Sequence, residues 1–264
     1  MGPRIAAWKD LFLLAEGFSS ETKEFLYTTF SYVDEEDNVY HGQIFKPKLQ
    51  ITLEEASAAL VRLPDEDIFP ELPPDGQLTI APETLRSGVY IKRPRLSSYE
   101  DYKEQDALTV IPALMLDEAH ALELVSQNPH PGLIGYYGCR VRRGRITGLV
   151  LEKHEDDLNH HTQYVGPVDK KRFMEALEDA VRHLHSLGLA HNDINPANIR
   201  VNKSGLPVLV DFGSCREVGR KLGSSRGTPG WIDEGDDYLT SEERHDLFGL
   251  AKIRAWLDDP VPLH

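Results

Sequence analysis

The sequence lacks the features of secreted, membrane-spanning and nucleic-acid-binding proteins. Its 264 residues include two cysteines, too few for a disulfide framework and without metal-ligand spacing, which favours a reducing environment. Lysine and arginine number 29 against 43 aspartate and glutamate, so the net charge of −14 would repel a nucleic acid or an anionic membrane. No apolar run approaches the length of a membrane span, and the first residues match neither a signal peptide nor a myristoylation site. We therefore expect a soluble intracellular protein of the cytoplasm or nucleus, with no nucleic-acid or membrane partner.

Residues 1–75 contain no recognisable site, and we expect them to form an N-terminal extension. Local patterns predict a helix, a hairpin around an acidic turn, a second helix and an acidic, proline-rich spacer on the surface. Thr52 and Glu55 form the capping box that opens the second helix. The four parts are predicted at residues 1–30, 34–52, 53–63 and 63–76. The hairpin includes strand-like segments at 40–45 and 48–52.

A short strand over 88–94 and a helix opening near Pro112 follow the extension. The helix places one carboxylate, Glu118, in an otherwise apolar stripe formed by Met115, Leu122 and Val125. A charge buried in such a stripe needs a partner, whereas a charge at its edge is solvated. The periodicity leaves both interpretations open.

The next segments predict strands at 133–141 and 146–152 and a helix capped by Asp169 that ends at Gly188. Between the second strand and the helix lies a charged stretch rich in histidine. Its spacing matches no common set of metal ligands, and a solvated linker is the preferred interpretation. These histidines are His154, His160 and His161.

The chemistry-bearing motifs come after this helix. His191-Asn192-Asp193 is followed by Asn198, then by a strand and the Asp-Phe-Gly triplet that begins at Asp211. Upstream, Lys92 lies in a strand that precedes a helix, and HPGLIGYYG follows that helix. Downstream come GTPGWIDE and HDLFGLAKIRAWL. In this order the motifs resemble those of the protein kinases, and in particular small fungal kinase-like proteins with HND, DFG and GTPGW motifs.

The resemblance implies an α+β, two-lobed kinase-like domain over residues 76–264. Its small β-rich N-lobe would span 76–151 and its helical C-lobe 152–264. The C-lobe would be shortened, because the chain stops soon after Trp256 and the last helices of a kinase would be missing. The extension or a protein partner would then cover the apolar surface that those helices bury.

The same resemblance implies Mg-ATP as cofactor and assigns the site residues. Asn198 and Asp211 would supply oxygen ligands to magnesium, which prefers such ligands. Asp193 would accept or orient the proton of the acceptor hydroxyl. Lys92 would hold the α- and β-phosphates, with Glu118 fixing its ammonium.

Two further groups of residues take their expected roles from the resemblance. The backbone at the end of the strand predicted over 146–152, and just after it, would bind adenine, as the hinge of a kinase does. A stack of four apolar side chains would connect the lobes, with His191 packed in the core. The hinge residues are Leu151, Glu152, Lys153 and His154. The stack consists of Leu122, Tyr136, His191 and Phe212.

The chain departs from the kinase pattern at three places. No GxGxxG motif precedes Lys92, since Gly76 and Gly88 are the only glycines among residues 75–88. Asn192 stands where kinases have arginine, which disfavours activation through an arginine–phosphate pair. Asn195 replaces a lysine, and a neutral amide stabilises the γ-phosphate less than a cation does. We therefore expect a slow kinase whose turnover rises when Asn195 becomes lysine.

The favoured function is an ATP-dependent protein kinase that phosphorylates Ser or Thr hydroxyls of a protein. One alternative is a pseudokinase-type protein that binds nucleotide or acts as a scaffold, supported by the missing glycine-rich loop and by Asn195. A second is a small-molecule phosphotransferase of the aminoglycoside-kinase type. GTPGWIDE and HPGLI disfavour the second, because such segments organise a protein-substrate groove.

Overall fold

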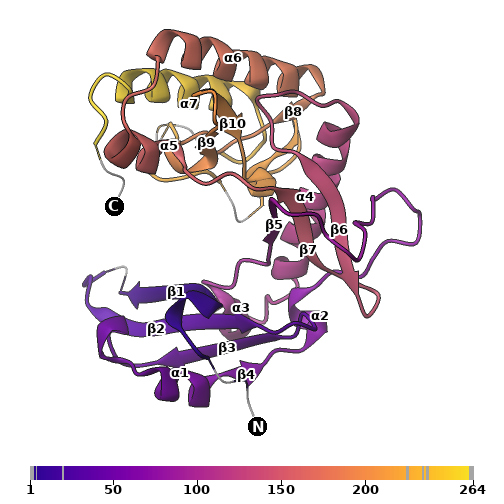
Figure 1. Ribbon diagram of the computed structural model, residues 1–264, viewed down its shortest axis with the longest axis vertical. Helices are drawn as coiled ribbons and strands as arrows, with labels where there is room; N and C mark the ends of the chain where they lie inside the picture. The colour runs from indigo at the N-terminus through magenta and orange to yellow at the C-terminus, as the bar shows by residue number, and fades with distance from the viewer. Residues whose placement is uncertain are drawn as a thin grey trace. The chain divides into compact units, whose positions relative to one another are not determined.

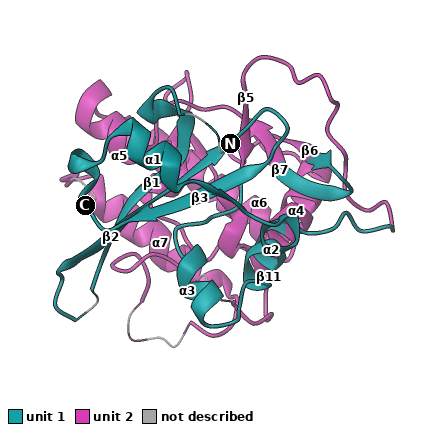
Figure 2. Cartoon of the chain, turned by 90° about the horizontal axis from the view of Figure 1, so that it is seen from below, with its two compact units in different colours: residues 1–74, 93–115, 140–148 teal, residues 75–92, 116–139, 149–264 magenta. Residues whose placement is uncertain are grey.

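The computed structural model describes residues 3, 5–19, 21–223, 226–233, 235 and 238–261, and it mixes helices with strands (Figure 1). The α+β class predicted from the sequence is confirmed. The chain forms two compact units, each assembled from three separate segments (Figure 2). Unit 1 contains residues 1–74, 93–115 and 140–148. Unit 2 contains residues 75–92, 116–139 and 149–264.

Unit 1 is built on a four-stranded antiparallel sheet in the order β1-β2-β3-β4. Its strands are β1 (Leu11–Phe18), β2 (Phe25–Val33), β3 (Val39–Ile44) and β4 (Val61–Arg62). The helices are α1 (Leu53–Ala59), α2 (Asp65–Ile68), α3 (Tyr99–Glu104) and the first residues of α4 (Val110–Gln127). One apolar cluster is centred on Phe30 and Ile51, and a second on Phe69 and Tyr99.

The local predictions for residues 1–75 are partly wrong. Where a helix was predicted over 1–30, the chain forms β1 and most of β2, because Leu, Phe, Tyr and Thr side chains there pair across an antiparallel ladder. The segment 48–52 contains a short 3-10 helix in place of a strand. The hairpin turn and the strand at 40–45 are confirmed by β2 and β3.

The capping box is also confirmed. The Glu55 N–H donates to Thr52 Oγ1 over 3.2 Å, and the Thr52 N–H donates to Glu55 Oε2 over 3.0 Å. The proline-rich stretch 63–76 is not a surface spacer throughout. Its apolar residues Ile68 and Phe69 are fully buried in unit 1, so the hydrophobic effect outweighs the local turn signals.

Asp37, at the turn between β2 and β3, is the polar centre of unit 1. Its carboxylate is 1% exposed and accepts hydrogen bonds from Arg93 Nη2 and Arg140 Nε, both over 2.6 Å, and from Thr147 Oγ1 over 3.0 Å. Burial alone would raise the pKa of Asp37, but the two guanidinium groups outweigh it and lower the pKa. The ion pairs join all three segments of unit 1.

Unit 2 combines a small sheet with the longest helices. The sheet has the order β5-β7-β6, and β5 runs antiparallel to β7. Two short antiparallel pairs, β8 with β11 and β9 with β10, carry the loops of the candidate site. The strands are β5 (Val89–Lys92), β6 (Tyr136–Arg142), β7 (Arg145–Glu152), β8 (Leu189–Ala190), β9 (Ile199–Val201), β10 (Pro207–Leu209) and β11 (Arg216–Glu217). Residues 140–142 of β6 and 145–148 of β7 belong to unit 1. The helices are the remainder of α4, then α5 (Leu158–His160), α6 (Lys170–Ser186) and α7 (Glu243–Trp256).

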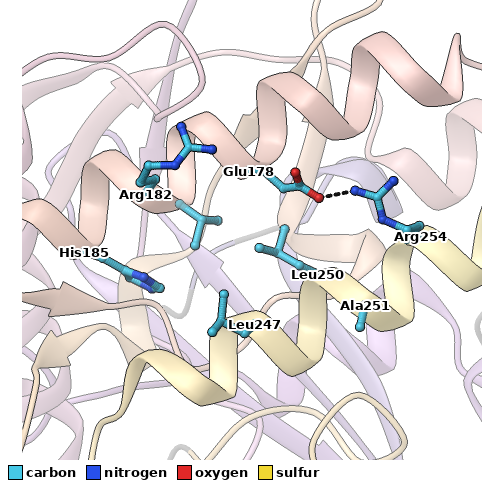
Figure 3. Close-up of a pocket in the computed structure, with 8 residues that line it drawn as sticks. Glu178, Arg182, His185, Leu247, Leu250, Ala251 and Arg254 are labelled. Atoms are coloured by element: carbon cyan, nitrogen blue, oxygen red, sulfur yellow. Dashed lines mark hydrogen bonds and ion pairs between the residues drawn. The ribbon is translucent and has the colours of Figure 1, made fainter.

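Helices α6 and α7 pack side by side in unit 2 (Figure 1). Asp169 caps α6 as predicted, accepting a hydrogen bond from the Arg172 N–H over 3.2 Å, and Gly188 follows the helix with φ of +75°. Between the helices lies a groove of about 350 Å³, bridged by an ion pair of Glu178 with Arg254 (Figure 3). Leu247, on the α7 wall of this groove, is 56% exposed.

The compact units draw on interleaved segments of the chain. The division into an extension over 1–75 and lobes over 76–151 and 152–264 stays a prediction. In the part of the chain that the structure describes, no helix is both long enough and apolar enough to cross a bilayer.

Candidate active site

Lys92 lies at the end of β5 and joins two carboxylates within unit 2. Its Nζ donates to Glu118 Oε1 over 2.6 Å and to Asp211 Oδ1 over 2.7 Å. The position of Lys92 is fixed by the ladder between β5 and β7, where it faces Leu149. Glu118 projects from the buried face of α4 and is 5% exposed. Of the two interpretations of Glu118 from the sequence, the structure therefore supports the partnered one.

The Lys92 ammonium stabilises both carboxylates of this cluster, which repel each other. Burial alone would lower the pKa of Lys92, but the attraction of Glu118 and Asp211 outweighs it and raises the pKa. The ammonium of Lys92 lowers the pKa of Asp211 against the effect of burial. Burial raises the pKa of Glu118, and Lys92 opposes that shift. Lys92 thus stays a cation over the whole physiological range.

We predict that Lys92 and Glu118 act as one unit. Lys92→Met and Glu118→Gln should each lower kcat/KM for phosphoryl transfer, and the double variant should lose little more than either single variant, because both changes disorder the same ammonium. Glu123 serves as the matched control on α4, since its carboxylate instead accepts hydrogen bonds from Thr79 N and Oγ1. Strictly additive losses in the Lys92–Glu118 cycle would exclude the partnership.

Asp193 lies in the loop after β8, and three side chains, one of them from the GTPGW stretch, donate to its carboxylate oxygens. Oδ1 accepts from Thr228 Oγ1 over 2.8 Å and from Asn195 Nδ2 over 2.9 Å, while Oδ2 accepts from Asn198 Nδ2 over 3.0 Å. Asn195 Oδ1 in turn caps the short 3-10 helix Pro196–Asn198, accepting from the Ala197 N–H over 2.9 Å. The orientation of the Asp193 carboxylate is therefore fixed by three donors.

Thr228 is the contact that sequence reasoning missed. No role in the site was predicted for Thr228, and the structure places its hydroxyl on Asp193. The resemblance to kinases did not indicate that Thr228 contacts Asp193, and the two residues are 35 positions apart in the sequence. Ser224 and Ser225, the other phosphorylatable residues of this segment, lie outside the described residues.

Asp246, on α7, anchors the same loop through hydrogen bonds to its backbone N–H groups. This fully buried carboxylate accepts hydrogen bonds from the N–H groups of His191 and Asn192 over 2.8 and 2.7 Å, and from His185 Nε2 over 2.8 Å. Hydrogen bonds to a charged acceptor are stronger than neutral ones. α7 therefore sets the backbone position of the loop that carries Asp193.

Asn192, which stands where kinases have arginine, is a buried hydrogen-bonding centre with φ of +62°. Its Nδ2 donates to Ala190 O, Ser214 O and Ser241 Oγ over 2.8, 3.1 and 2.9 Å. The amide thus ties the loop directly to the segments on either side of the GTPGW stretch. Asparagine tolerates this left-handed backbone better than most residues, which suits it to the position.

His191 is a structural histidine, in agreement with its predicted place in the core. It is fully buried, its Nε2 donates to Val210 O over 3.0 Å, and its ring meets that of Phe212 edge-on at 5.3 Å. Leu122 and Tyr136, the other predicted members of the apolar stack, are also buried.

The expected hinge begins with the last two residues of β7, Leu151 and Glu152, and part of its backbone is already bonded within the protein. The Glu152 N–H donates to Gly135 O over 2.7 Å, and the Lys153 N–H donates to Gly88 O over 3.0 Å. Adenine would have to use other backbone groups of this segment. The assignment of Leu151, Glu152 and His154 to nucleotide binding therefore stays a prediction.

The segment before β5 takes the place of a glycine-rich loop with a different arrangement. Residues 79–81 pair with Cys139 of β6, through Cys139 N to Thr79 O at 2.7 Å and Ala81 N to Cys139 O at 2.9 Å. Gly138 permits this close approach, because a Cβ there would lie 2.7 Å from Ala81 N. The three-stranded sheet thus gains a bridged segment at the edge formed by β6.

The donor chemistry fits a magnesium–nucleotide complex. Asn198 directs its Nδ2 to Asp193, which leaves its Oδ1 as the amide atom able to bind a cation. The Asp211 side chain is 49% exposed and ionised. No group of three or more His, Cys, Asp or Glu side chains suited to a metal occurs among the described residues. A magnesium ion that binds together with nucleotide phosphates needs only one or two protein carboxylates.

Comparison with known proteins identifies the family. Residues 89–234, more than half of the chain, match the protein kinase domain. This match includes Lys92, Glu118, the loop of Asp193 and Asp211. The chain therefore belongs to the protein kinase family, and its mixed helices and strands are those of a kinase-like fold.

Fungal serine/threonine kinases are among its curated relatives. The chain is 31% identical over 128 residues to the serine/threonine-protein kinase/endoribonuclease IRE1 of Hypocrea jecorina, a match over 41% of this chain and 10% of the relative. It is 27% identical over 138 residues to the serine/threonine-protein kinase SSK22 of Saccharomyces cerevisiae, over 50% and 10%. The probable cell division control protein 7 homolog 2 of Encephalitozoon cuniculi is 30% identical over 106 residues, over 40% and 30%. The chain thus spans at most about a third of the length of these relatives.

Proposed function

We propose that this chain is a protein kinase that transfers the γ-phosphoryl group of Mg-ATP to Ser or Thr hydroxyls of a protein. The observation that carries the proposal is the bonding of Lys92 to both Glu118 and Asp211. One cation is thereby held between a buried carboxylate and an exposed one. Family membership supports ATP and a protein substrate in general terms, and two of the named relatives are serine/threonine kinases.

Each residue of the cluster has a defined part in this reaction. Bound Mg-ATP supplies the phosphoryl group and the neutralising metal. Lys92 binds phosphate oxygens, and Glu118 keeps its ammonium in place. Asp211 and Asn198 are the oxygen ligands for the metal. Asp193, fixed by its three donors, orients the acceptor hydroxyl and accepts its proton. Phosphoryl transfer depends mainly on such positioning and charge stabilisation.

A pseudokinase-type function is the second candidate. It is favoured by the segment 79–81, which is bonded to β6 and Glu123 where kinases have a glycine-rich loop. Transfer of radiolabelled phosphate from Mg-ATP to generic Ser/Thr protein acceptors separates the two functions. Incorporation supports the kinase, whereas nucleotide binding without incorporation supports the pseudokinase.

We predict that Mg-ATP stabilises the chain through Asp211. Ligand at a hundred times its dissociation constant adds about 2.7 kcal/mol to the free energy of unfolding. For a chain of this size the melting temperature should rise by roughly 5–10 °C. Asp211→Ala should abolish most of the rise, whereas Asp258→Ala, which removes an exposed carboxylate paired with Lys170, should keep it. An unchanged melting temperature of the wild type in millimolar Mg-ATP would contradict the nucleotide site.

A further inference from the structure

An aromatic groove lies between the GTPGW stretch and the second half of α7. It has a volume of about 570 Å³, and its walls are largely apolar. Trp231 from the GTPGW stretch and Trp256 from α7 meet edge-on, with ring centroids 6.3 Å apart. Phe248, on the same helix, also lines it. We call this feature the tryptophan groove.

The walls of the tryptophan groove are held together by Lys252. Its Nζ donates to Gly230 O over 2.6 Å and lies 5.6 Å from the centre of the Phe248 ring. The backbone before Trp231 is thereby fastened to α7. The groove is a built feature of unit 2, because both of its walls are fixed by side-chain contacts.

The chain places one of its own residues at the edge of the groove. The indole Nε1 of Trp256 donates to the carbonyl oxygen of Val261 over 3.0 Å. The Val261 side chain contributes to the lining but stays 56% exposed, so it fills the groove only in part. The groove therefore binds the backbone of a valine through an indole donor and still has room for more.

The sequence around Val261 specifies an extended backbone. Pro260 precedes it and Pro262 follows it. Proline fixes its own φ, and the residue before a proline is confined to extended or polyproline conformations. Such segments leave their carbonyl groups unbonded, and aromatic grooves recognise them with little entropic cost. Val261, which lies at the groove, thus has the sequence neighbours of a suitable ligand.

The groove is joined directly to the candidate site. The Trp231 N–H donates to Thr228 O over 2.9 Å in a tight turn, and the Thr228 hydroxyl donates to Asp193 Oδ1 over 2.8 Å. A peptide held against Trp231 would therefore lie one turn of chain away from the carboxylate that orients the acceptor hydroxyl. This connection favours a phosphoryl-acceptor protein as the occupant.

We propose that the tryptophan groove docks a Pro-x-Pro segment of the protein substrate. The apolar residue between the prolines places its side chain in the groove, and its own carbonyl accepts the indole hydrogen bond, as that of Val261 does. The chain's own segment around Val261 competes for the same place. The substrate assignment rests on the proposed kinase function, whereas binding of the segment does not.

The binding test uses the full chain and the peptide acetyl-Asp-Asp-Pro-Val-Pro-Leu-amide, followed by the indole N–H signals in NMR spectra. We expect the Trp256 signal, assigned with Trp256→Phe, to shift on titration. Trp256→Phe should weaken binding about fivefold, the equivalent of one hydrogen bond. Val261→Gly should strengthen it about threefold, because the internal competitor is loosened. Leu247→Ala, in the separate groove between α6 and α7, should leave the affinity unchanged (Figure 3).

Equal binding of a peptide with both prolines replaced by alanine would overturn the proposal, as would no shift of the Trp256 signal. Asp193→Asn should bind the peptide as the wild type does, so that failure of catalysis and failure of docking are distinguishable. For the substrate assignment, a serine peptide linked to Pro-Val-Pro should show a KM about fivefold below that of its alanine counterpart at equal kcat. Equal KM values would reject that assignment.

Discussion

Replacing Asp193 by asparagine should lower the rate of phosphoryl transfer by about 10²- to 10⁴-fold while the affinity for Mg-ATP is kept. The variant keeps the shape of the side chain but removes the basic oxygen needed for the proton of the acceptor hydroxyl. Thr228, Asn195 and Asn198 all donate hydrogen bonds to the Asp193 carboxylate. In the variant one carboxylate oxygen becomes an NH₂ group, which cannot accept a hydrogen bond from these donors. The predicted loss is therefore in kcat, measured with radiolabelled Mg-ATP.

The control for this variant is its stability. Its melting temperature without ligand, and the rise produced by Mg-ATP, should show that the fold and the nucleotide site are intact. Transfer rates equal to those of the wild type would remove Asp193 from the mechanism. If neither protein transfers phosphate although both bind Mg-ATP, the pseudokinase function is supported.

The Asn195→Lys variant should be about 10- to 100-fold slower than the wild type. The resemblance to kinases predicted the opposite, a faster variant, because a lysine would add a cation near the γ-phosphate. The observed contacts change that expectation, because Asn195 both caps the 3-10 helix Pro196–Asn198 and donates to Asp193. Loss of a cap costs about 1 kcal/mol, and loss of a hydrogen bond to a charged group about 1.5–3 kcal/mol. Of the two, the hydrogen bond to Asp193 acts on the reaction, and its loss alone corresponds to a decrease in rate on the order of 10- to 100-fold.

The variant Asn195→Ser separates the two contributions. Serine is a good cap but is too short to replace the amide on Asp193, so any remaining loss in kcat measures that contact. Asn195→Lys with turnover above that of the wild type, at unchanged affinity for Mg-ATP, would instead support the expectation from the sequence.

The arrangement of the site was more predictable than the fold around it. The order of the motifs indicated which residues belong together, and the structure brings Lys92 to Glu118 as expected. The contact of Lys92 with Asp211 was not predicted. The roles of these residues remain proposals. The contact of Thr228 with Asp193 could not be predicted, because a hydrogen bond between loops depends on tertiary geometry and leaves no periodic signal.

Residues 1–75 show why local patterns failed. The segment 11–33 lacks a strict alternation of apolar and polar residues, and its strands are specified by pairing with each other and with β3. In the stretch 63–76 the prolines and acidic residues gave strong turn signals. These signals predicted an exposed stretch, whereas Ile68 and Phe69 are buried. Their burial depends on packing against the segment 93–115 of the same unit.

The ion pairs of Asp37 have a consequence for the order of events during synthesis. Arg93 lies 56 positions after Asp37, and Arg140 lies 103 positions after it. At about 5–20 residues per second, a ribosome needs on the order of 5–20 s to proceed from Asp37 to Arg140. Until Arg93 has been made, the Asp37 carboxylate has neither guanidinium partner and must stay in water, and until Arg140 has been made it has at most one of the two. Unit 1 can therefore close only when residues 140–148 have left the ribosome, although it begins with the first residues made.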